Sequence, residues 1–155
     1  MRKRSLGWIC VFGLVVQGCG GNVDQPATKD EMRQTALADV GELYRMYVVT
    51  KKKTPRKVAD FAPLERMSPA GFLAVRGGDI VVRFEATLPD TQMEPGKSSS
   101  DEVLAYEKSV PGTGGQVLML NRTIRAMTPD EFKAAKLAGA SSSADASSKA
   151  ARKTQ

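Results

Sequence analysis

Residues 102–127, EVLAYEKSVPGTGGQVLMLNRTIRAM, decide the fold because they alternate short apolar runs with turn residues. Each apolar run is five or six residues long, which is typical of β-strands. Pro111–Gly115 is a glycine-rich turn, and Asn121-Arg122 is a two-residue hairpin turn in which asparagine tolerates the positive φ. The segment therefore predicts three successive strands, which are Glu102–Glu107, Gln116–Leu120 and Thr123–Met127.

A fourth strand is predicted just before this segment, over residues 79–86, DIVVRFEA. Ile80, Val82 and Phe84 fall on one face of this strand, and the residues between them fall on the other. Such alternation is typical of an antiparallel sheet with one face on the core and one face in water. We therefore expect a four-strand antiparallel meander.

Apolar residues also recur at three- and four-residue spacing over residues 29–50, which is the period of an α-helix. They are Met32, Ala36, Val40, Leu43, Tyr44, Tyr47 and Val48. Thr28 is a typical N-cap, and Asp30 and Glu31 place negative charge in the first turn, where the helix dipole favours it. We expect an N-terminal amphipathic helix, with Tyr44 and Tyr47 packed in the core rather than forming a binding platform.

Two further pairs of residues predict short helices, because a hydroxyl N-cap followed by proline is a typical helix start. Thr54-Pro55 opens one that runs to about Phe61, and Ser68-Pro69 opens another, which Gly77 ends. The alternative for the second is a strand at 72–76, joined to the next strand by a hairpin at Gly77-Gly78.

The end of the chain contains a capping box, Thr128-Pro-Asp-Glu131, which predicts a closing C-terminal helix through Leu137 that Gly139 ends. Residues 140–155 are rich in serine, alanine and lysine and have no apolar face, so they predict a disordered tail. Residues 89–101 are expected to be a disordered insertion, or alternatively a recognition loop. Residues 29–139 are then one small α+β domain.

The composition excludes several classes of functional site. The 155 residues include no histidine, which excludes histidine-ligated metal sites and histidine general bases. The two cysteines are too few for a disulfide framework or a four-thiolate zinc site. The domain has no Ser-x-x-Lys motif and no spaced carboxylate cluster. We therefore predict no catalytic residue, no metal and no cofactor, and a protein that is not an enzyme.

The net charge of +6 is concentrated near the two ends of the chain. Residues 1–18 carry an excess of three positive charges and residues 141–155 an excess of two, which leaves only +1 for residues 19–140. A nucleic-acid-binding protein is expected to carry its basic excess on the folded domain. The charge distribution therefore argues against a nucleic-acid partner.

One basic cluster does lie within the predicted domain, with five cations in seven residues. Its members are Lys51, Lys52, Lys53, Arg56 and Lys57. One interpretation is a solvated helix end whose cations complement the negative end of the dipole. The other is a binding site for phosphate or an anionic polymer.

The N-terminus has the organisation of an export signal, with the basic residues Arg2–Arg4 before the 11-residue apolar run Leu6–Val16. The run is too short to span a bilayer as a permanent helix, for which about 20 apolar residues are needed. The next residues, Val16-Gln17-Gly18-Cys19, resemble the lipobox of bacterial lipoproteins. The resemblance implies a signal peptide over residues 1–18, cleavage between Gly18 and Cys19, and lipidation of Cys19 by fatty acyl chains such as palmitate.

The same resemblance implies that residues 19–28 tether the domain to a membrane, with the protein in the bacterial cell envelope facing the periplasm or the exterior. Two or three acyl chains would be needed, because one chain anchors only marginally. The alternative is an ordinary secretory signal, since Val16 and Gly18 also satisfy a small-residue cleavage rule.

Residues 105–125 are similar to the C-terminal segment of prepilin-type, pseudopilin-like proteins with an H-x9-D-G signature. Ala105-Tyr106-Glu107, Gly114-Gly115 and Val117-Leu118 match that pattern. The signature histidine falls on Pro111 and the Asp-Gly pair on Asn121-Arg122, so the signature residues themselves are absent. The similarity implies a helix followed by a meander.

The leading hypothesis is a membrane-anchored envelope lipoprotein whose small, non-enzymatic domain binds a protein or a cell-wall polymer. One alternative is a pseudopilin-like component of a secretion apparatus. Another is a soluble secreted module that binds anions through the basic cluster.

Overall fold

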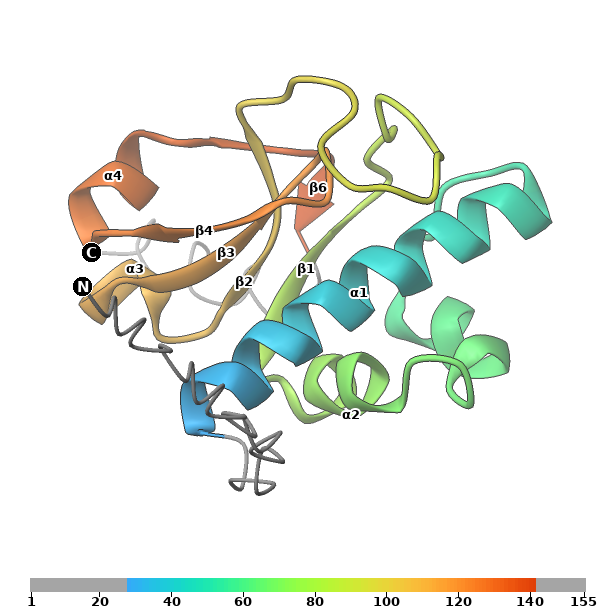
Figure 1. The fold of residues 1–155 in the computed structure, drawn as a ribbon, viewed down its shortest axis with the longest axis horizontal. Coiled ribbons are helices and arrows are strands. Elements are labelled where there is room, and N and C mark those ends of the chain that lie inside the picture. Colours follow the sequence, from blue (N-terminus) through green and yellow to red (C-terminus); the bar gives the residue numbers. More distant parts are fainter. Residues whose placement is uncertain (1–27, 142–155) are drawn as a thin grey trace, which may run out of the picture.

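The computed structural model describes residues 28–141 and has the predicted α+β fold, a long helix followed by short helices and an antiparallel meander (Figure 1). The predicted signal peptide, nearly all of the tether, and residues 142–155 of the predicted tail lie outside the described residues.

Helix α1, Lys29–Lys51, begins where the sequence predicts, because Thr28 and Glu31 form a capping box. The Thr28 hydroxyl accepts a hydrogen bond from the Glu31 amide at 3.3 Å, and the Glu31 carboxylate accepts one from the Thr28 amide at 2.7 Å. One face of the helix is buried through Leu37, Val40 and other residues of the predicted apolar stripe, including both tyrosines. The expectation that Tyr44 and Tyr47 belong to the core is confirmed.

The predicted four-strand meander is confirmed. Its strands are β1 (Ile80–Phe84), β2 (Glu102–Glu107), β3 (Gly115–Met119) and β4 (Ile124–Met127). The order across the sheet is β4-β3-β2-β1, so each strand pairs with its neighbour in sequence. Strands β1 and β2 pair with Val82 opposite Ala105. Between β2 and β3 the register shifts, because Val103 and Ala105 oppose the adjacent residues Met119 and Leu118.

This shift is a β-bulge, and it decides which face of the sheet each β2 residue occupies. Leu104 and Ala105 both pack with α1, whereas Val103 and Tyr106 pack on the opposite face. Strand β2 is therefore buried on both faces, and the expectation of one solvated face is wrong for this strand. The second face is covered by two short helices, α3, Val110–Thr113, and α4, Pro129–Ala134, with the Tyr106 and Phe132 rings 4.6 Å apart.

Of the two predicted short helices, one is displaced along the chain and one is confirmed. The first is the 3-10 helix η1, Val58–Leu64, because the Asp60 carboxylate accepts hydrogen bonds from the Arg56 and Lys57 amides and so caps a later start than Thr54. The second is α2, Pro69–Gly77. The alternative strand and hairpin are wrong, since Gly78 ends α2 in the left-handed conformation.

Both predicted turns of the meander differ from expectation. Pro111 lies inside α3, so the segment after β2 is a helical turn rather than a plain glycine turn. The β3–β4 connection has four residues, 120–123, and is closed by a hydrogen bond from the Met119 amide to the Thr123 carbonyl at 2.8 Å. The positive φ of 65° falls on Arg122 and not on Asn121.

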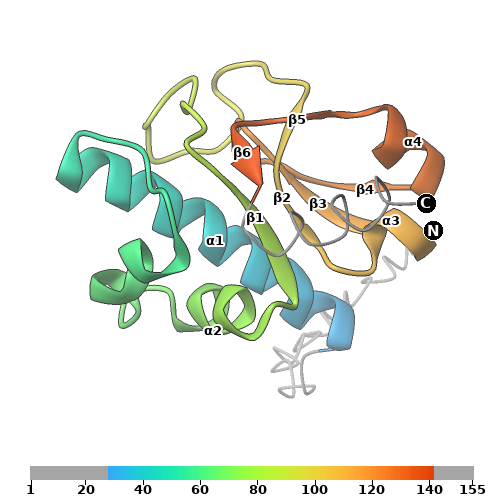
Figure 2. The ribbon, with the colours of Figure 1, turned by 180° about the vertical axis from the view of Figure 1, so that it is seen from behind.

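The closing helix ends earlier than predicted, because the chain leaves it to pair with the sheet. Helix α4 stops at Ala134, and the next residues form β5, Lys136–Leu137, parallel to the start of β2. Strand β6, Ala140–Ser141, then pairs with the end of β1 (Figure 2). The predictions of a helix through Leu137 and of disorder from residue 140 are therefore wrong at these positions.

Gly139 does not end a helix as predicted but forms the bend between β5 and β6, with a φ of 50°. A Cβ atom there would lie 2.0 Å from the Phe84 carbonyl oxygen and 2.7 Å from the Ala86 amide nitrogen. The Arg83 guanidinium holds the bend by donating to the carbonyls of Ala138, at 2.9 Å, and Gly139, at 3.2 Å. The close approach requires glycine at this position.

We predict that Gly139→Ala lowers the free energy of unfolding by about 2 kcal/mol or more, because a Cβ atom must displace the end of β1 and the positive φ is strained. Gly77→Ala is the matched control, since its Cβ would meet only Asp79 at 3.5 Å and its φ is helical. Urea denaturation followed by circular dichroism measures both. Equal stabilities of the two variants would contradict the proposed role of the bend.

Candidate functional site

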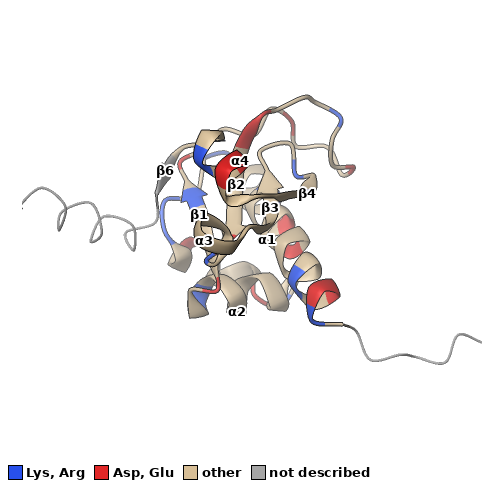
Figure 3. Ribbon diagram, turned by 90° about the vertical axis from the view of Figure 1, so that its left-hand side faces the viewer, with Lys and Arg blue, Asp and Glu red and all other residues tan. Residues whose placement is uncertain are grey.

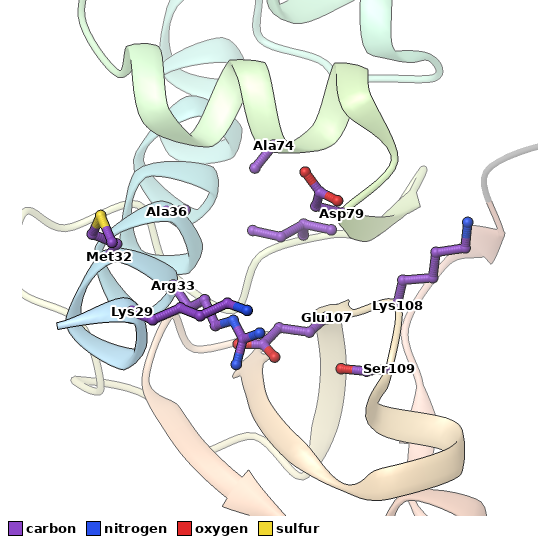
Figure 4. Close-up of a pocket in the computed structure, with 10 residues that line it drawn as sticks. Lys29, Met32, Arg33, Ala36, Ala74, Asp79, Glu107, Lys108 and Ser109 are labelled. Carbon is purple, nitrogen blue, oxygen red and sulfur yellow. The ribbon is translucent and has the colours of Figure 1, made fainter.

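A cavity of about 660 Å³ opens between the start of α1, the end of α2 and the end of β2 (Figure 4). Its apolar wall is formed by Met32 and Ala36 on α1, Ala74 on α2, and Ile80 at the start of β1. Ala36 and Ile80 are buried, whereas Met32 is 55% exposed at the rim. The helical spacing of Met32 and Ala36 places both on one face of α1, and small residues at 36 and 74 leave the space open.

The polar wall of the cavity carries charges of both signs. Glu107, the last residue of β2, is only 9% exposed and points into the cavity, whereas Lys29, Arg33 and Lys108 are exposed around it (Figure 4). Asp79 adds a second, exposed carboxylate on the side near α2. The cavity therefore combines one buried negative group with several exposed charges.

Main-chain hydrogen bonds hold the two sides of the cavity together. The Lys108 amide donates to the Asp79 carbonyl at 2.9 Å, and the Asp79 amide donates to the Ala74 carbonyl at 2.9 Å. Ile80 lies opposite Glu107 in the β1–β2 register. These contacts fix the main chain of Glu107 relative to the apolar wall.

Within residues 28–141, the Glu107 carboxylate has no hydrogen bond and no ion pair with another side chain or main-chain group. Figure 4 shows the Arg33 and Glu107 side chains directed toward one another, but Arg33 pairs instead with Asp30, at 3.5 Å. Since no buried side-chain oxygen among the described residues lacks a hydrogen-bond partner, the Glu107 carboxylate oxygens are open to the solvent of the cavity. Glu107 was not singled out from the sequence, because its position in the alternation predicts only a strand residue.

The five residues of the basic cluster lie at the other end of α1 and in the loop that follows it. All five are exposed, and Lys52 caps the helix with a φ of 54°. Arg56 pairs with Glu85 at 2.8 Å, which reduces the local positive charge. Since Lys51 follows Ala36, the last α1 residue of the cavity wall, by 15 positions, about 22 Å of helix separates this cluster from the cavity.

A second polar constellation surrounds Arg122, whose side chain is 2% exposed. Its guanidinium pairs with Glu42 on α1 at 2.9 Å and with Asp90 at 3.5 Å. It also donates hydrogen bonds to three successive main-chain carbonyls of the loop, those of Gln92, Met93 and Glu94. This arrangement ties the β3–β4 turn, α1 and the 89–101 loop together.

The 89–101 loop is therefore a structured part of the domain, and the expectation of a disordered insertion is wrong. Asp90 organises it by accepting hydrogen bonds from the Ser98 and Gln92 amides, at 3.0 and 3.3 Å. Hydrogen bonding by Ser98 is the main reason that the pKa of Asp90 lies below its ordinary value, and the Arg122 charge adds to this effect. The sequence signals that were missed are Arg122 in the β3–β4 turn and the unusual length of the 89–101 loop, which its side chain contacts.

Gly18 and Cys19, the predicted cleavage and lipidation residues, lie outside the described residues. Among residues 28–141, no helix is both long and apolar enough to cross a membrane, and no three side chains of the ligating types are grouped to hold a metal ion. Comparisons with protein-family models, curated proteins and solved structures found no match to this chain.

We predict that Arg122→Ala lowers the free energy of unfolding by about 3 kcal/mol, because it leaves the Asp90 carboxylate and the loop carbonyls without their cation, whereas Glu42 keeps its pair with Arg45. Arg125→Ala, three residues later on β4 and exposed, is the matched control and should change stability by no more than about 0.5 kcal/mol.

Hydrogen exchange measured on both variants separates local from global effects. We expect the amides of Gly96 and Ser98 to lose protection in Arg122→Ala alone. They donate to the Asn121 carbonyl and the Asp90 carboxylate, which the contacts of Arg122 hold in place. Unchanged protection in that variant would show that Arg122 does not order the loop.

Proposed function

We propose that this chain is a membrane-anchored lipoprotein of the bacterial envelope, with Cys19 as the lipidated residue and the 29–139 domain as a non-enzymatic binding module. The single observation that supports the anchor is the lipobox resemblance at Val16–Cys19, preceded by a basic and then an apolar segment. The observation that supports binding is the cavity with its apolar wall and with Glu107 directed into it. We propose a protein or cell-wall polymer as the partner.

The anchor would place the cavity near the membrane. Thr28 lies nine positions after Cys19, and a fully extended chain of that length spans about 30 Å at most. The first turn of α1 contributes Lys29, Met32 and Arg33 to the cavity rim. Since the tether joins the domain at this end of the helix, the cavity would face the space just above the lipid surface.

Binding is favoured over catalysis because of the side chains that the cavity offers. Its lining has no histidine or cysteine, and its one hydroxyl, that of Ser109, makes no hydrogen bond with a carboxylate or lysine of the cavity. A cavity of about 660 Å³ is within the range of ligand-binding pockets, which is about 300–1,000 Å³.

We predict that the native protein, extracted from membranes, has an intact mass that lacks residues 1–18 and includes two or three acyl chains. Cys19→Ala should carry no acyl chain, because the thiol that accepts the diacylglyceryl group is gone. Cys10→Ala is the matched control, and its mature form should still lack residues 1–18 and carry the acyl chains. A native mass without the signal and without acyl chains would instead identify a soluble secreted domain.

The basic cluster supports a second candidate function, binding of an anionic polymer. Four exposed lysines, at 51, 52, 53 and 57, make no ion pair with any residue between 28 and 141. We predict that binding to polyphosphate, if this function is correct, weakens steeply as salt rises from about 50 to 200 mM. A variant with Lys51, Lys52 and Lys53 changed to Gln should lose it, and binding that is absent or insensitive to salt would exclude this function.

A further inference from the structure

We propose that the outer face of helix α2 lies on the phospholipid surface to which Cys19 anchors the chain, with Leu73 and Met67 in the headgroup region. This docking rests on the proposed lipid anchor, and it assigns the side of the domain that faces the lipid. Three observations carry it, which are the composition of α2, the arginines beside it and the place where the tether joins the domain.

Helix α2 is apolar on its outer face as well as on the face that packs in the core. Its sequence, PAGFLAVRG, contains one charged residue, Arg76, and no acidic residue. Helical periodicity places its exposed residues opposite the buried ones, and apart from Arg76 they are Pro69, Ala70, Leu73 and Gly77. A surface helix normally carries polar residues on its outer face, so an apolar outer face indicates that another surface covers it.

Two large apolar side chains are exposed on this face and beside it. Leu73 is 49% exposed, and Met67, in the turn before α2, is 64% exposed. The headgroup region of a bilayer takes such side chains out of water, and the strength of binding increases with the apolar area removed. A bilayer presents a continuous surface, so it can cover both side chains without a pocket shaped for either.

The charges near this face are those that a phospholipid surface can accept. Arg66, just before α2, and Arg76, in its last turn, are exposed and make no ion pair with a residue of the described range. The Arg76 guanidinium lies 5.5 Å from the centre of the Phe72 ring. Arginines beside an apolar helix face can pair with lipid phosphates while their stems cover apolar surface. Glu65 and Asp79 balance the two arginines, so we expect docking on electrically neutral lipid too.

The tether joins the domain at the end where α2 lies. In Figures 1 and 3, the first turn of α1 and helix α2 are together at the lower end of the domain, and the 89–101 loop is at the upper end. Met32 on α1 and Ala74 on α2 also line the same cavity. The tether from Cys19 to Thr28 spans about 30 Å at most, so the anchor keeps this end of the domain close to the bilayer. This proximity favours lipid over a protein partner as the surface that covers α2.

The test introduces a tryptophan at either end of the domain and reconstitutes the membrane-extracted protein into phosphatidylcholine vesicles with brominated acyl chains. The sequence has a single tryptophan, Trp8, within the predicted signal peptide, and the natural chain gives its background fluorescence. We expect brominated lipid to quench Leu73→Trp and Met67→Trp at least about two-fold, because an indole ring at the interface contacts the acyl chains. Met93→Trp, at a position 78% exposed in the 89–101 loop, is the matched control and should keep its fluorescence.

Equal quenching of Leu73→Trp and Met93→Trp would overturn the proposal, and so would the absence of quenching in both Leu73→Trp and Met67→Trp, in favour of a protein partner on α2. A dimer in detergent that Leu73→Glu dissociates would overturn it in favour of a second copy of the chain. Two positions are tested and circular dichroism checks the fold of each variant, so misfolding of one variant does not decide the outcome. The intact mass of the same sample reports the acyl chains on Cys19, so failure of the docking is distinguished from failure of the anchor.

Discussion

Burial of one face of α1 is the constraint on which the other contacts of the domain depend. Leu37, Val40 and Leu43 are fully buried against the sheet and the short helices, and each such side chain contributes about 1.5–3 kcal/mol of transfer free energy. The Tyr44 hydroxyl donates to the Ala86 carbonyl at 2.9 Å and accepts from the Ala86 amide at 2.8 Å. This pair of bonds fixes the chain as it leaves β1, and burial raises the pKa of Tyr44 well above its ordinary value.

The same helix positions α2 and thereby one wall of the cavity. At Gly71 the two helices approach so closely that a Cβ atom would lie 2.6 Å from the Asp39 Cβ and 2.7 Å from the Val40 amide nitrogen. The Asp39 carboxylate accepts a hydrogen bond from the Gly71 amide at 3.2 Å. The glycine contact therefore fixes the main chain of α2 against α1, and the β1–β2 register fixes Ile80 opposite Glu107 at the cavity wall.

The two buried charged residues, Arg122 and Glu107, illustrate opposite solutions to the cost of burial. Arg122 is paired with carboxylates and main-chain carbonyls, so its charge is compensated within the domain. Glu107 has no such partner among the described residues, and its carboxylate oxygens are instead open to the solvent of the cavity.

The sequence by itself determined the elements whose signals are local. The helix from residue 29, the α2 helix and the four strands follow from periodicity, caps and turn residues within each segment, because these act over one or two helical turns or a single strand. The export signal and lipobox are local patterns too, and they remain predictions. Only the tertiary structure decided the path of residues 135–141, where pairing with β1 and β2 replaced a predicted helix. It also decided that Arg122 and Glu107 are buried. Burial depends on which distant segments cover a residue, and no short stretch of sequence contains that information.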